Sequence, residues 1–212
     1  MFIATLPSGP FETNAYVVAC PLTQKAAIID PGVDSFSKIK EVLENNHFIP
    51  TMILLTHSHW DHIAGVAELK QHYSIPVYVH PDDHGNLLNP RSDGLPCPYH
   101  FPGVTADHLF KDKETITLGS LPFEIIETPG HTPGGVCFYF PSEKVLFSGD
   151  TLFHGSIGNL SFPTSRPELM WPSLKKLALL PPETVVYPGH GPTTTIGHER
   201  WLANAEKIFG NY

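Results

Sequence analysis

Four side chains that commonly bind metal ions fall within six consecutive residues of this sequence. They lie in the segment Thr56-His57-Ser58-His59-Trp60-Asp61-His62, directly after an apolar run. Imidazole and carboxylate groups bind zinc and other first-row transition metals. Alternate side chains of an extended backbone point to one side, so His57 and His59 can bind one ion. Asp61 and His62 fall where the chain is expected to turn into a helix, and they can face a second ion.

Three further candidate ligands follow at wide spacing, each just after a short apolar run. They are His131 in TPGHTPGG, Asp150 in VLFSGD and His190 in VVYPGHG. Proline and glycine fix tight loops and let the backbone approach an ion closely. Each residue alone is more often a plain turn residue than a ligand. Together they supply three strand-end ligands for one crevice, which is where α/β folds place their sites.

The elements that must position these residues alternate between short β-like runs and helical patterns. The predicted strands of the first half are Phe2 to Leu6, Ala15 to Cys20, Ala26 to Asp30, Met52 to Leu55 and Val77 to His80. Those of the second half are Thr115 to Leu118, Phe123 to Glu127, Val136 to Phe140, Val145 to Phe147 and Thr184 to Tyr187. The predicted helices are Ser35 to Asn46, Ile63 to Tyr73, Pro167 to Leu179 and His198 to Phe209. The first three strands are expected to form an antiparallel meander, and 82–104 is expected to be an irregular loop beside the site.

Composition sets the class of protein. With 41% hydrophobic and 16% charged residues in 212, the chain is expected to form one globular α/β domain over residues 1–212. A formal net charge of −8 argues against nucleic-acid binding. No export signal or membrane-spanning run of about 18 apolar residues is found, so a cytoplasmic enzyme acting on a small molecule is expected. The pattern leaves the oligomeric state open. Three cysteines at wide spacing, Cys20, Cys97 and Cys137, indicate unpaired thiols.

The order of the motifs resembles that of the metallo-beta-lactamase superfamily. The motifs are THSHWDH, PGHTPGG, the aspartate of SGDTLF, and YPGHG. The resemblance spans nearly the whole chain, and GHTPGG, GDTLFHGSIG and PGHGPTTTIGHER are similar to compact glyoxalase II-like proteins, the hydroxyacylglutathione hydrolase-like subgroup. It implies an αββα sandwich, two facing sheets with helices outside, with the site at one edge. It also implies that His57, His59 and His131 bind the first metal, that Asp61, His62 and His190 bind the second, and that Asp150 bridges both.

The donor types agree with that division. A carboxylate offers two lone-pair sites and suits the bridging position of Asp150. Two divalent ions are expected, with zinc the best fit and iron or manganese nearly as suitable. Such a pair lowers the pKa of a bridging water from about 16 toward about 7 and polarises a carbonyl. We therefore expect a metal-bridged hydroxide to cleave a small thioester or related ester, with Asp61 orienting the water or receiving a proton.

Other reaction classes remain compatible with these motifs. Persulfide dioxygenases keep the same loop but bind one iron through two histidines and one aspartate. Lactone hydrolysis would use the same attack on a carbonyl. A catalytically silent metal-binding module is a third alternative, although a silent relative usually loses a ligand and this set is complete.

Two departures from the glyoxalase II pattern affect the substrate. Those proteins commonly continue SIGR with an acidic residue two places on, whereas this chain has Ser156-Ile157-Gly158-Asn159-Leu160-Ser161. Full-length glyoxalase II also carries a C-terminal helical domain that binds glutathione, whereas this sequence ends at Tyr212 after one predicted helix. Glutathione recognition is therefore not carried over.

Several other residues are weighed outside the ligand set. Tyr139 and Tyr187 are expected in the core, and Glu199 and Arg200 are expected in structural ion pairs or a cap. Surface roles or contacts behind the ligands are expected for His80, His84, His100 and His154. Of these four, His154 is the best candidate for a substrate contact because it lies closest to Asp150.

Overall fold

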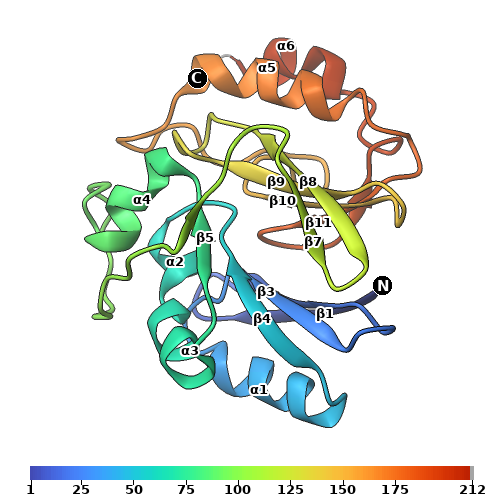
Figure 1. Cartoon of the computed structure of the whole chain (residues 1–212). Coiled ribbons are helices and arrows are strands. Elements are labelled where there is room, and N and C mark those ends of the chain that lie inside the picture. Colours follow the sequence, from blue (N-terminus) through green and yellow to red (C-terminus); the bar gives the residue numbers. More distant parts are fainter. Residues whose placement is uncertain (211–212) are drawn as a thin grey trace.

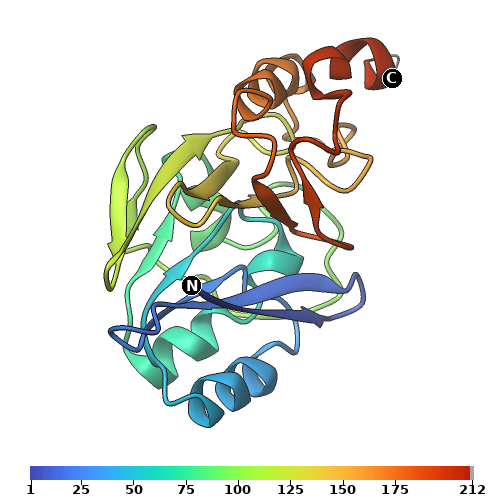
Figure 2. The same cartoon turned by 90° about the vertical axis from the view of Figure 1, so that its right-hand side faces the viewer.

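Two six-stranded sheets face each other in this computed structural model, and helices cover their outer surfaces (Figure 1). The structure describes residues 1–210. Helices α1 and α3 lie against one sheet, whereas α5 and α6 lie against the other, and the turned view shows the same layering (Figure 2). The predicted αββα sandwich is confirmed.

The first sheet has the order β1-β2-β3-β4-β5-β6. Its strands are β1 (Phe2–Ser8), β2 (Thr13–Ala19), β3 (Lys25–Ile29), β4 (Ile49–Leu54), β5 (Val77–Val79) and β6 (His108–Leu109). The first three pair antiparallel, which confirms the predicted meander, and the remaining pairs are parallel. The two-residue strand β6 was not predicted.

The second sheet has the order β12-β11-β10-β9-β8-β7. Its strands are β7 (Thr115–Leu118), β8 (Leu121–Glu127), β9 (Val136–Phe140), β10 (Val145–Gly149), β11 (Val185–Pro188) and β12 (Thr194–Thr195). Strands β7 to β10 pair antiparallel, and β10 pairs parallel with β11. Because β9 is antiparallel to both β8 and β10, these two strands run in the same direction, and β11 is parallel to β10. Strands β8, β10 and β11 therefore all end at the same edge of the sheet.

Both faces of each sheet are buried, which explains the nearly continuous apolar strands. In β2, Ala15 and Val17 face the helix-side core, whereas Tyr16 and Val18 face the core between the sheets. A third core packs the second sheet against α5. The predicted core positions of Tyr139 and Tyr187 are confirmed: Tyr139 belongs to this third core, and Tyr187 stacks on Phe147 in the core between the sheets.

The helices differ from prediction in three places. The observed helices are α1 (Phe36–Asn45), α2 (Trp60–Ile63), α3 (Val66–Tyr73), α4 (Pro81–Leu88), α5 (Pro167–Leu177) and α6 (Ala205–Phe209), with a 3₁₀ turn at Leu202–Asn204. Within residues 1–210, none of these helices is both long and apolar enough to cross a membrane.

The predicted helix Ile63 to Tyr73 is wrong at its start, because a break at Gly65 separates α2 from α3. The Gly65 N–H donates to Pro31 O at 2.8 Å instead of continuing the helix. A Cβ on Gly65 would lie 2.9 Å from the carbonyl oxygens of Pro31 and Gly32. The break therefore lets the loop after β3 pack directly against the ligand-bearing segment.

The other two corrections concern the loop 82–104 and the terminal helix. The loop begins with helix α4, which has Pro81 at its first position and a cap in which the Asp82 N–H donates to His80 Nδ1 at 3.2 Å. The terminal helix does not start at His198. Glu199 instead accepts hydrogen bonds from Gly155 N and Trp201 Nε1, which fixes a turn before the 3₁₀ segment.

Candidate metal centre

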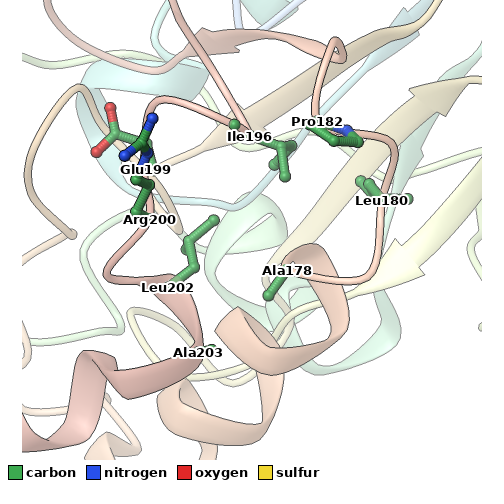
Figure 3. Close-up of a pocket in the computed structure, with 9 residues that line it drawn as sticks. Ala178, Leu180, Pro182, Ile196, Glu199, Arg200, Leu202 and Ala203 are labelled. Carbon is green, nitrogen blue, oxygen red and sulfur yellow. The ribbon is translucent and has the colours of Figure 1, made fainter.

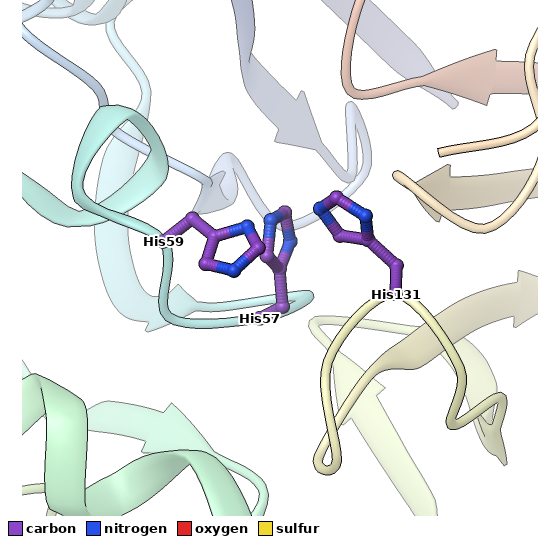
Figure 4. Close-up of side chains that lie close together, drawn as sticks. All are labelled: His57, His59 and His131. Carbon is purple, nitrogen blue, oxygen red and sulfur yellow. The ribbon is translucent and has the colours of Figure 1, made fainter. Parts of the chain in front are cut away.

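Three imidazoles converge at the shared edge of the two sheets. His57 and His59 lie in the loop after β4, and His131 lies in the loop after β8; Figure 4 shows their rings directed toward one another. Donor atoms of the three rings lie within 4.8 Å of one another, and all three side chains are buried. In the described residues 1–210, the Nε2 atom of each ring has no hydrogen-bond partner. Three buried rings with converging donor atoms, each with an unpaired Nε2, fit a cation.

A second cluster joins Asp61, His62 and His190. His62 Nε2 lies 3.2 Å from His190 Nε2, and each of these nitrogens lies 3.4 Å from Asp61 Oδ2. Four donors placed tetrahedrally at about 2.05 Å from a zinc ion are about 3.3 Å apart. The three atoms therefore have the mutual spacing of ligands around one ion.

Asp150 lies between the two clusters. Its Oδ2 is 3.4 Å from His131 Nε2 of the first cluster and 3.5 Å from His190 Nε2 of the second. Its Oδ1 is 3.5 Å from His62 Nε2. One carboxylate thus contacts ligands of both clusters, which is the placement that a bridging ligand requires.

The outer nitrogens Nδ1 of His62, His131 and His190 each have a partner. His131 Nδ1 donates to Asn159 O at 2.8 Å, and His190 Nδ1 donates to Phe11 O at 3.0 Å. His62 Nδ1 lies 3.1 Å from Asp30 Oδ2. A neutral imidazole that donates through Nδ1 carries its lone pair on Nε2, so each of these rings presents an acceptor to the centre in its neutral form.

Charge states in the cluster also suit a cation. Burial and the neighbouring His131 lower the pKa of His59 to about 3, and burial lowers the pKa values of His57 and His131 as well. Burial opposes ionisation of Asp61, but His62 and His190 hold its pKa at about 2. The first cluster is therefore neutral and Asp61 is ionised at neutral pH, which are the states that bind metals.

His190 behaves differently from the first three histidines. Burial favours its neutral form, but hydrogen bonds to Asp150 and Asp61 raise its pKa to about 11. Without a metal this ring holds a proton between two carboxylates. A bound cation would take the place of that proton.

Comparison with known proteins places the chain in a family. A model described as the metallo-beta-lactamase superfamily matches residues 8–190. The chain belongs to the metallo-beta-lactamase superfamily. Hydroxyacylglutathione hydrolase GloC of Haemophilus influenzae is 33% identical over 207 residues, covering 94% of this chain and 95% of that protein.

Two solved structures agree in fold and sequence. The BLEG-1 B3 metallo-beta-lactamase has a TM-score of 0.84 and 40% identity, covering 93% of this chain and 96% of that chain. TTHA1623, solved in a di-iron-bound form, has a TM-score of 0.78 and 40% identity, covering 94% and 96%. Members of the superfamily are mostly hydrolytic enzymes. The family resemblance inferred from the motifs is confirmed.

Asp30 contacts the candidate ligand His62 of this metallo-beta-lactamase superfamily member and was not predicted from the sequence. Its Oδ1 accepts from Thr56 N at 2.8 Å, and its Oδ2 accepts from Thr56 Oγ1 at 2.6 Å beside His62 Nδ1. The side chain is buried at the end of β3. A strand-end aspartate in Ile-Ile-Asp-Pro-Gly was the available signal.

Substituting Asp30→Asn is expected to weaken metal binding about 10- to 100-fold, as loss of a partner behind a ligand typically does. An amide cannot accept from Thr56 N, Thr56 Oγ1 and His62 Nδ1 together. Titration of the metal-free protein with zinc measures the change. Unaltered affinity in a folded variant would show that Asp30 does not support the centre.

Other missed residues hold the ligand loops together. Asp83, fully buried in α4, accepts from Ser58 N at 2.7 Å and from Gly134 N at 2.8 Å, so it ties the loop after β4 to the loop after β8. Asn14 Nδ2 donates to Pro188 O at 3.0 Å and to Gly191 O at 2.9 Å, which fixes the loop that carries His190. The two sheets are thereby joined at the site.

An open cavity of about 620 Å³ lies beside the centre. Asp61, His59, His131, Asp150 and His190 contribute to its lining. Small-molecule sites typically have volumes of roughly 300–1,000 Å³. His154 is exposed, as the surface role expected for it predicts, with its ring 4.9 Å from that of His198, and Phe153 lines the cavity in its place.

The other histidines outside the clusters agree with expectation. His80 Nε2 lies 3.1 Å from Glu127 Oε1, and His84 Nε2 accepts from Ala106 N at 3.3 Å. His100 is exposed. The three cysteines, Cys20, Cys97 and Cys137, are free thiols, as predicted.

A second groove of about 350 Å³ lies between the end of α5 and the C-terminal segment (Figure 3). Leu180, Ile196 and Leu202 line it together with Glu199 and Arg200. It shares no lining residue with the ligand clusters. Glu199 is buried and hydrogen-bonded, in line with the structural role expected for it.

Proposed function

We propose that this protein is a dinuclear metallohydrolase that cleaves a small thioester or a related ester. The main support is that seven candidate ligands converge beside an open cavity and that several of their buried donor atoms are unpaired. These residues are His57, His59, Asp61, His62, His131, Asp150 and His190. His57, His59 and His131 would hold one ion, and Asp61, His62 and His190 the other. Asp150 would be shared. Zinc fits the donor set, and iron or manganese fits nearly as well.

Two bound divalent ions would supply an acidified water molecule and a polarised substrate carbonyl. Residues of the chain hold the reacting groups in position. Thr13 Oγ1 donates to Asp61 Oδ2 at 2.8 Å, which fixes this carboxylate at the cavity wall. From there Asp61 orients the attacking water and accepts its proton. In the described part of the chain, no serine or cysteine lines the cavity, so attack by water rather than by a side chain is favoured.

Two comparisons support the reaction class. A relative covering nearly the whole chain is named as a hydroxyacylglutathione hydrolase, and a neighbouring structure was solved with two irons. The complete set of donors argues against a silent module. The mononuclear dioxygenase alternative keeps the same loop but uses two histidines and one aspartate, so the number of bound ions distinguishes it from a dinuclear hydrolase.

Metal removal and reloading test the proposal. The protein is stripped with a chelator, reloaded with zinc, iron or manganese, and assayed against a thioester, an ester, a lactone and a β-lactam. We expect hydrolysis of the thioester or ester to disappear on stripping and to return on reloading with two ions per chain. Oxygen uptake with a persulfide, at one iron per chain and with no hydrolysis, would overturn the proposal.

A further inference from the structure

The cavity beside the candidate centre has apolar walls. Its lining outside the clusters is Phe11, Trp60, Leu95, Pro96, Phe153, Asn159 and Phe162. Asn159 is the single polar side chain among them, and no lysine or arginine of the described chain lines the cavity. A substrate in this cavity therefore meets aromatic rings and the metal centre, but no cationic side chain.

Two of the aromatic rings that line the cavity lie next to histidines of the two clusters. Phe162 lies 5.3 Å from the ring of His59 and 5.6 Å from that of His131, above the first cluster. Phe153 lies 6.0 Å from the ring of His190, beside the second cluster. Groups attached to a carbonyl at the centre would thus lie against these rings.

A third aromatic surface borders the cavity. Phe11 packs 5.2 Å from Trp60, and Trp60 lies 5.5 Å from Tyr99. Phe11 is 59% exposed although it is a large apolar side chain. Exposed aromatic rings grouped around a concave site are typical of ligand-binding surfaces.

We propose, on the basis of the hydrolase function above, that the substrate is a thioester or ester whose acyl and leaving groups are apolar and uncharged. Burying an aromatic or branched group against these rings is favourable. A charged group held against these rings, away from the metal ions, would lose hydration without gaining a partner.

Four matched thioesters test the effects of the acyl group and of the leaving group separately. Lactoyl or phenylacetyl acyl groups are combined with glutathione, which is anionic, or with N-acetylcysteamine, which is neutral. For the zinc-loaded protein, we expect kcat/KM to be about 10- to 100-fold higher for phenylacetyl-N-acetylcysteamine than for lactoylglutathione. Equal values, or a preference for either glutathione thioester, would overturn the substrate inference while leaving the hydrolase function intact. Hydrolysis of none of the four, nor of the corresponding esters, would defeat the proposed function itself.

Alanine variants of the aromatic residues that line the cavity test whether these rings cause the substrate preference. Phe162→Ala and Phe11→Ala are each expected to raise KM for the phenylacetyl substrate several-fold while metal content stays at two per chain. Phe11→Ala keeps the backbone carbonyl that accepts from His190, so it guards against a simple loss of the centre. Leu22→Ala, at an 83% exposed turn position, is the matched control. Unchanged kinetics in both wall variants would contradict the proposal.

A charge-adding variant tests the same inference in the opposite direction. Asn159 is exposed at the cavity, and its backbone oxygen, which accepts from His131, is retained on substitution. Asn159→Arg is expected to raise kcat/KM for the glutathione thioesters several-fold, and the gain should shrink as salt is added. The absence of any gain would show that missing positive charge does not set the preference.

Discussion

Replacing Asp150 with alanine is expected to abolish hydrolysis and to release metal. The carboxylate lies 3.4 Å from His131 Nε2 and 3.5 Å from His190 Nε2, so its loss removes a ligand from both clusters at once. Metal ions contribute several kcal/mol of transition-state stabilisation, so kcat/KM should fall by about 10³-fold or more. Metal analysis of the purified variant and steady-state kinetics measure the two effects.

Asp82→Ala is the matched control for this substitution. Asp82 lies at the start of α4 with its side chain 63% exposed, outside both clusters. It should keep full metal content and normal turnover. An Asp150→Ala protein with two ions per chain and an unaltered rate would refute the bridging assignment.

Gly189→Ala is the second substitution with a large expected effect. A Cβ at this position would lie 2.1 Å from Asp150 Oδ1 and 2.9 Å from His62 Cε1. Backbone hydrogen bonding to Gly149 O at 2.8 Å leaves little room for the loop to move away. Since small displacements of reacting groups can cost about 100-fold, we expect at least that loss in kcat/KM. Reduced metal affinity should accompany it.

Gly85→Ala provides a matched control for the added methyl group. No atom lies within 4 Å of the Cβ that this substitution would add in α4. Alanine in a helix should stabilise the fold by about 1 kcal/mol and leave the activity unchanged. If Gly189→Ala behaved as this control does, the loop carrying His190 would not be packed as tightly as described.

The convergence of the candidate ligands was predictable from sequence because these residues follow a local rule. Each candidate comes just after a short apolar run, and strands that run in the same direction end at one edge of a sheet. The structure gathers the loops after β4, β8, β10 and β11 at that edge. The strands of three or more residues were equally predictable, since both faces are buried and their sequences are nearly continuously apolar, whereas the two-residue strands β6 and β12 were not predicted.

Most residues that support the candidate ligands could not be found in this way. Asp30 has the same local signal, a position just after a buried strand, and was overlooked. Asp83 and Asn14 act through contacts with loops that are distant in sequence, and nothing in their local pattern distinguishes them from turn or surface residues. Helix α4 was also missed, because Gly85 and Asn86 lower its helix propensity. Its stability comes from tertiary contacts, such as the hydrogen bond from Asn86 Nδ2 to Ser58 O at 2.6 Å.

The cavity walls were predicted least well. Proximity in sequence to Asp150 suggested His154 as a substrate contact, yet the adjacent Phe153 faces the cavity. Adjacent residues in an irregular loop point in different directions, and no periodicity indicates which one faces inward. The apolar character of the walls, and with it the substrate inference, depends on the folded structure.

Metal content per chain, measured on active protein, tests the central claim most directly. The distances within the two clusters predict two divalent ions per chain, with hydrolysis proportional to occupancy and absent from the stripped protein. Full hydrolytic activity with one ion or none per chain would contradict the dinuclear centre.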